Sequence, residues 1–172
     1  MKRVVTVTVN NNSGVLNRIT GLFAKRQFNI ESITVGPTGN PGISKMTFIV
    51  PIEDPAKMEQ LLKQLQKQID VLKVSDITDK AIVTRELALV KVQCPPSVRS
   101  EVYSIIEPFR ATVIDMGKNM VTVQVTGEPS KVEAFIELLK PYGIKDISRT
   151  GATAFVREQQ KTEASQLSIL QL

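Results

Sequence analysis

The spacing of apolar residues along this chain switches repeatedly between a period of two and a period of three to four. The first half of the chain contains one complete series of such segments. Alternation is typical of half-buried strands, and apolar residues three and four apart are typical of amphipathic helices. The predicted strands are residues 3–9, 30–36, 44–52 and 71–78. The predicted helices are residues 14–26 and a second that begins at Asp54-Pro55, with the apolar stripe Met58, Leu61, Leu62, Leu65 and Ile69. The order βαββαβ predicts a ferredoxin-like unit.

The second half repeats this order of elements without repeating the residues. Its predicted strands are residues 85–93, 111–116, 119–126 and 144–156, the last interrupted near Gly151. Its helices begin at Pro95-Pro96-Ser97 and after Gly127-Glu128-Pro129. We therefore predict an α+β protein with two βαββαβ domains, residues 1–78 and 85–157, joined by a linker over 79–84. Residues 158–172 are rich in Gln and Ser and predict a flexible tail.

The two helices of each unit can cover only one face of its sheet. The other face and the edge strands then remain open unless a partner covers them. We therefore expect at least a homodimer, formed by edge-to-edge pairing of sheets or by helix contacts at the edge.

The junction between the first strand and the first helix carries the most informative motif, Asn11-Asn12-Ser13-Gly14. The first N–H groups of a helix have no internal partner and carry partial positive charge. Such a junction is suited to binding an anion such as a carboxylate. The alternative is that the Asn and Ser side chains only cap the helix.

Composition removes several kinds of chemistry. The chain has no histidine and one cysteine, Cys94, which excludes the commonest general base, an internal disulfide and a cysteine-based zinc site. We interpret Cys94 as a passive apolar residue. The net charge of +5 comes from scattered basic residues and indicates a solvated surface. Without a spanning apolar run or a signal-peptide pattern, we predict a cytoplasmic protein.

The first unit resembles the ACT domain, a small module that senses amino acids. The matching segments are residues 9–16, 21–26, 29–35, 63–65 and 69–74. In the second half, similar segments are residues 85–92, 107–111, 123–127 and 148–151. Together they resemble the small regulatory subunit of acetolactate synthase (acetohydroxyacid synthase), over about residues 2–157.

The resemblance implies regulation rather than catalysis. Such subunits bind valine, and often leucine or isoleucine, and confer feedback inhibition on a separate catalytic large subunit, which they also activate. That partner uses thiamine diphosphate, magnesium and FAD, whereas this chain is expected to hold no cofactor, no metal and no catalytic residue. Residues 85–92 are a candidate contact with the large subunit.

In the family the amino acid lies between two ACT domains, which implies contacts at Asn11, Gly14, Val15, Leu16, Asn29 and Ile30. The N–H groups of Val15 and Leu16 could receive the ligand carboxylate, and Gly14 would allow close approach of the backbone. Ile30, Val35 and Leu16 could form an apolar pocket. Asn29 has the alternative of a simple turn residue before a strand.

Four other interpretations remain to be weighed. The chain could be another ACT-type amino-acid regulator. An RNA-binding module shares the βαββαβ order, but the first strand has no aromatic residue and the third offers only Phe48 for base stacking. A ligand-gated repressor lacks a spare DNA-reading helix. A stand-alone enzyme would rest on a carboxylate pair formed by Glu31 and Asp70.

Overall fold

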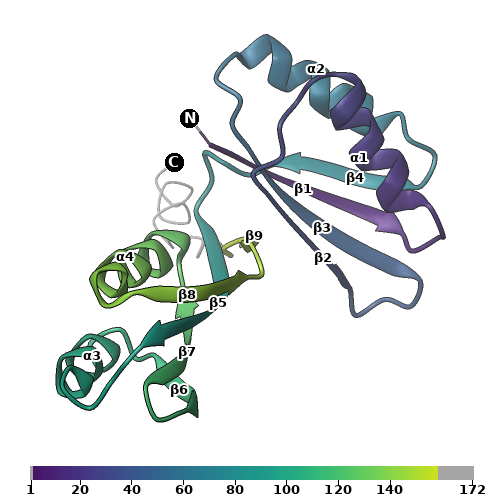
Figure 1. The fold of residues 1–172 in the computed structure, drawn as a ribbon. Helices are drawn as coiled ribbons and strands as arrows, with labels where there is room; N and C mark the ends of the chain where they lie inside the picture. The colour runs from purple at the N-terminus through teal and green to yellow at the C-terminus, as the bar shows by residue number, and fades with distance from the viewer. Residues whose placement is uncertain (1, 159–172) are drawn as a thin grey trace, which may run out of the picture.

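The computed structural model describes residues 2–158, which form two domains of similar design (Figure 1). The elements of the first domain are β1 (Arg3–Asn10), α1 (Val15–Lys25), β2 (Ser32–Pro37), β3 (Ile43–Val50), α2 (Pro55–Gln66) and β4 (Val71–Asp76). The antiparallel sheet has the order β2-β3-β1-β4, and both helices lie on one face. This confirms the ferredoxin-like prediction and leaves β2 and β4 as the sheet edges.

The core of the first domain lies between the sheet and its two helices. The alternating valines of β1 are buried, and Phe48 of β3 stacks on Phe23 of α1 with ring centroids 4.9 Å apart. The predicted stripe of α2 is wrong at Ile69, whose side chain is 94% exposed. Helix α2 ends at Gln66, and Ile69 follows in a turn outside the helical register.

The second domain contains β5 (Ile82–Gln93), α3 (Arg99–Ile106), β6 (Thr112–Met116), β7 (Met120–Gly127), α4 (Pro129–Leu139), the 3-10 turn η1 (Lys140–Tyr142), β8 (Ile144–Arg149) and β9 (Thr153–Val156). Its strands have the order β6-β7-β5-β8, and β9 pairs with the beginning of β5. Residues 82–84 were expected in the linker, but they are strand because they pair with β9. Cys94 is buried, which agrees with its interpretation as an apolar residue.

The last strand is interrupted where the sequence predicts it. β8 pairs Arg149 with Ala88, and β9 resumes on the same strand by pairing Thr153 with Arg85. The pairing therefore accommodates one extra residue over 150–152, which is a bulge. Gly151 adopts φ of 79°, a left-handed conformation that glycine tolerates at little cost.

The sheet face of the first domain that lacks helices is not fully open, contrary to the expectation that only a partner would cover it. Strand β9 lies toward this face (Figure 1). Phe155 and Val156 of β9 share a groove with Thr6 and Thr8 of β1. The second domain of the same chain thus covers part of the surface that we expected a partner to cover.

None of the helices in the described part of the chain is long and apolar enough to cross a membrane. The predicted tail lies outside the described residues from position 159 onward.

Candidate functional site

The loop between β1 and α1 is held in place by Asp70, at the start of β4. The backbone carbonyl of Asp70 accepts from the Asn10 N–H at 2.9 Å. Its carboxylate accepts from the Asn12 side-chain amide at 2.9 Å and from the Arg18 guanidinium. On the other side, the Asn11 N–H donates to the Gly42 carbonyl at 2.8 Å. The loop is therefore held on one side by the connection between α2 and β4 and on the other by the connection between β2 and β3.

These contacts decide between the two interpretations of the junction. Gly14 stands at the N-cap position of α1 with φ of 82°, and no side chain caps the helix. The Asn12 amide, a possible cap, is instead bonded to Asp70. The capping interpretation is therefore wrong.

The helix N-terminus retains free hydrogen-bond donors. The Val15 N–H has a long bond of 3.3 Å to the Asn12 carbonyl. Within the described residues, no acceptor is found for the N–H groups of Leu16 and Asn17. Because such groups carry the positive end of the helix dipole, this loop suits an incoming carboxylate.

Asp70 positions the candidate loop, a role that the local sequence pattern around Asp70 does not reveal, because its partners Asn12 and Arg18 are remote along the chain. The side chain of Asp70 is 9% exposed. The hydrogen bond from Asn12 lowers the pKa of Asp70 most, burial opposes this effect, and the Arg18 guanidinium lowers the pKa further. The Asp70 carboxylate therefore remains ionised at pH values below those at which an ordinary aspartate takes up a proton.

This pKa shift predicts a pH-dependent cost for the substitution Asp70→Asn. A carboxylate with a lowered folded-state pKa stabilises the fold above its unfolded pKa, and the contribution disappears as pH falls through the folded pKa. We expect the variant to have a lower free energy of unfolding than wild type at pH 7. The difference should shrink below about pH 4. Urea denaturation at pH 7 and pH 3 measures the difference in free energy of unfolding between the two proteins. A difference that widens in acid would contradict the lowered pKa of Asp70.

The six predicted contact residues do not meet within one chain. Asn11, Gly14, Val15 and Leu16 lie at the N-terminal end of α1, whereas Asn29 and Ile30 lie beyond its C-terminal end. The helix has 11 residues, so the two groups are separated by about 16 Å along its axis. Val15 is buried, so only its backbone faces the loop, while Asn11 and Asn29 are exposed.

The edge beside these residues is apolar and uncovered. Leu16 of α1 is 45% exposed, and Val35 of the edge strand β2 is 46% exposed. Ile30 is partly buried and packs against the core. The predicted pocket residues are therefore distributed along one edge of the domain rather than gathered in a cavity of one chain.

The structure argues against two of the alternatives, the RNA-binding module and the stand-alone enzyme. Phe48, the candidate for base stacking, is fully buried on the helix side of the sheet. Glu31 precedes β2 and pairs with Lys2, whereas Asp70 precedes β4, at the opposite edge of the sheet. The two carboxylates therefore cannot act as one catalytic pair. Within the described residues there is also no group of side chains that could hold a metal ion.

The predicted contact of segment 85–92 with the large subunit stays a prediction, and the structure restricts it to one face of a strand. It lies in β5, which pairs with β7 on one side and with β8 and β9 on the other. Ala88, Val90 and Val92 are fully buried. Only the alternate side chains of this strand reach the open face of the sheet.

The two-domain fold, with an open helix N-terminus after β1, is the fold of the ACT class of proteins. A family model described as "AHAS small subunit-like ACT domain" matches residues 5–73, and another described as "Small subunit of acetolactate synthase" matches residues 85–158. The chain belongs to the acetolactate synthase small-subunit family, which operates in branched-chain amino-acid biosynthesis.

Individual relatives agree with this assignment. The acetolactate synthase small subunit of Bacillus subtilis is 62% identical over 169 residues, which cover 98% of each chain. A probable acetolactate synthase small subunit of Archaeoglobus fulgidus is 45% identical, over 94% of this chain and 100% of the relative. The crystal structure of the Thermotoga maritima small subunit superimposes with a TM-score of 0.84 at 37% identity, over 93% of this chain and 99% of that one.

Proposed function

We propose that this chain senses valine, with leucine and isoleucine as further ligands, and confers feedback inhibition on a catalytic large subunit that it also activates. The large subunit supplies the thiamine diphosphate, magnesium and FAD, and this chain holds none of them. The observation that carries the proposal is the uncapped N-terminus of α1, where the N–H groups of Leu16 and Asn17 have no acceptor within the described residues.

A homodimer unites the two groups of contact residues at opposite ends of α1. If two copies pair through their β2 edges around a two-fold axis, the two β2 strands run antiparallel. The N-terminal end of α1 in one copy then lies beside the C-terminal end of α1 in the other. Leu16 and Val35, which are exposed in the single chain, become buried in this arrangement. Burial of such apolar side chains favours association.

The chemistry of the combined site fits a free amino acid. The ligand carboxylate accepts from the N–H groups at the start of α1. The amide oxygens of Asn11 and of Asn29 can accept from the ammonium group, because each amide offers an acceptor and two donors. Leu16, Val35 and Ile30 surround a branched apolar side chain. Discrimination among branched ligands is modest, since one methylene contributes only about 1–3 kcal/mol.

Calorimetry on the purified small subunit tests the binding step. Two-fold pairing creates two equivalent sites, so we expect heat from valine with one ligand bound per chain. Reconstitution with the large subunit then tests regulation: activity should rise when this chain is added and fall when valine follows. Absence of heat with valine, leucine and isoleucine, or turnover of pyruvate by this chain alone, would contradict the proposal.

A further inference from the structure

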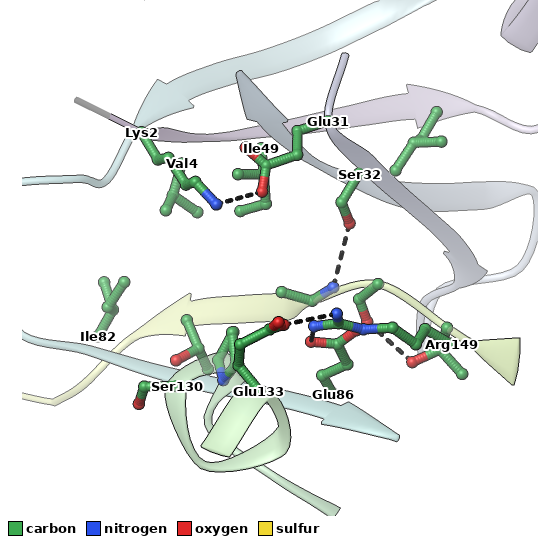
Figure 2. A pocket seen from close by; sticks show the side chains of 16 residues that line it. Lys2, Val4, Glu31, Ser32, Ile49, Ile82, Glu86, Ser130, Glu133 and Arg149 are labelled. Carbon is green, nitrogen blue, oxygen red and sulfur yellow. Dashed lines mark hydrogen bonds and ion pairs between the residues drawn. The ribbon is translucent and has the colours of Figure 1, made fainter. Parts of the chain in front are cut away.

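The two domains of the chain are joined by a specific pair of hydrogen bonds. The Ala152 N–H donates to the Ser32 hydroxyl at 3.2 Å, and the Thr34 hydroxyl donates to the Ala152 carbonyl at 2.9 Å. We call these two bonds the interdomain clasp. Figure 2 shows the bond at Ser32 crossing the cleft of about 950 Å³ between the domains. Ala152 is 3% exposed, so its backbone groups have little access to water.

The clasp requires glycine at the neighbouring position. Gly151 has φ of 79°, and a Cβ at this position would lie 2.3 Å from the Ser32 hydroxyl oxygen. Any larger residue would therefore force either the Ser32 hydroxyl or the bulge to move, and would strain its own backbone. The close approach of the two domains therefore depends on the absence of a side chain at Gly151.

The second domain holds the bulge firmly. Arg149, directly before it, binds both carboxylate oxygens of Glu86 at 2.7 and 3.1 Å and the carboxylate of Glu133 at 2.8 Å (Figure 2). Glu86 is 5% exposed. Paired, bidentate contacts of this kind fix geometry more strongly than single bonds. The Thr150 N–H also donates to the Leu87 carbonyl at 3.0 Å. The bulge is therefore tied by hydrogen bonds to β5, β8 and α4.

The two faces of strand β2 lie against different parts of the chain. Successive side chains of a strand point to opposite faces. Ser32 and Thr34 bind the bulge of the second domain, while Ile33 and Val35 lie on the face with the helices. The free edge of the same strand is the proposed dimer contact. One short strand therefore connects the effector site with the second domain.

We propose that β2 and the interdomain clasp couple effector binding to the second domain, and thereby to the catalytic subunit. The inference rests on the proposed valine site and adds the route by which its occupancy is transmitted. Ligand binding fixes β2 against the partner subunit, and the clasp transfers that position to the bulge. Coupling of this kind is a free energy shared between two sites and can be removed without removing either site.

The test separates binding from inhibition. The double variant Ser32→Ala/Thr34→Val removes both side-chain bonds with little change in volume, and Gly151→Ala forces the Ser32 hydroxyl or the bulge to move. For each variant, calorimetry gives the Kd of valine for the small subunit, and an activity titration gives the valine concentration for half-inhibition of the reconstituted enzyme. We expect Kd within about threefold of wild type and half-inhibition shifted by at least about tenfold, within the range of measured allosteric couplings.

The matched control is Ser130→Ala. Ser130 lines the same cleft, and no hydrogen bond of its hydroxyl is found within the described residues. We expect this variant to behave as wild type in both measurements. Wild-type inhibition by the double variant would overturn the coupling proposal while leaving the valine site intact. If calorimetry detects no binding of valine to the wild-type chain, the proposed function itself is overturned. The two failures are therefore distinguishable.

Discussion

A Gly14→Asp variant is expected to lose inhibition by valine, with at least about a hundredfold rise in the concentration required. Gly14 has φ of 82°, a left-handed conformation that aspartate and asparagine adopt more readily than most other side chains. The added carboxylate also stands at the helix N-terminus where the ligand carboxylate is proposed to bind. Since about 1.4 kcal/mol corresponds to a factor of ten, a hundredfold loss corresponds to about 2.8 kcal/mol, which repulsion between the two carboxylates and lost access to the helix N–H groups would supply. A valine titration of the reconstituted enzyme measures the effect.

Gly14→Asn is the matched control for this substitution. Asparagine has nearly the same size, tolerates positive φ better than most residues and carries no charge. We expect it to retain measurable inhibition with a smaller loss than the aspartate variant. Wild-type sensitivity in Gly14→Asp would rule out the junction loop as the effector site.

A Val35→Glu variant is expected to be a monomer at micromolar concentration and to be insensitive to valine. The substitution places a carboxylate at the proposed β2 edge of each copy, and two such charges would be buried close to the two-fold axis. Removing unpaired charges from water costs several kcal/mol each, which exceeds what the lost apolar contact alone would cost. Sedimentation velocity measures the oligomeric state, and activity titration measures the response.

The opposite edge of the same sheet offers a control with matched chemistry. Leu72 of β4 is 53% exposed, similar to Val35 at 46%. Leu72→Glu introduces the same charge at an edge strand that the proposed dimer does not use. It should remain a dimer and respond to valine. Dissociation by Leu72→Glu but not by Val35→Glu would move the interface to β4 and leave the two groups of contact residues apart.

The order of elements could be predicted from the sequence because each one carries a local signal. The alternating valines of β1 and the Asp54-Pro55 start of α2 depend only on neighbours along the chain. The interruption at Gly151 was also visible, since glycine within a strand pattern marks a bulge. Ile69 was misplaced because the helical period continued in the sequence past the point where α2 ends.

The candidate site was predictable only in part. Asn11 and Gly14 stood out because a helix start after a strand has a recognisable composition. Whether Asn12 caps the helix or binds Asp70 depended on a residue 58 positions away in the sequence, which no local pattern contains. The partner that Gly151 approaches, Ser32, is likewise remote along the chain.

The sequence by itself determined the strands and helices, the repeat of the βαββαβ unit and the family, because periodicity and motifs are local properties. Only the tertiary structure decided that Asn12 bonds to Asp70, that β9 covers part of the sheet face of the first domain, and that Ala152 bonds to β2. These are consequences of chain packing over long separations, where the position of a hydrogen-bond partner in space is independent of its position in the sequence.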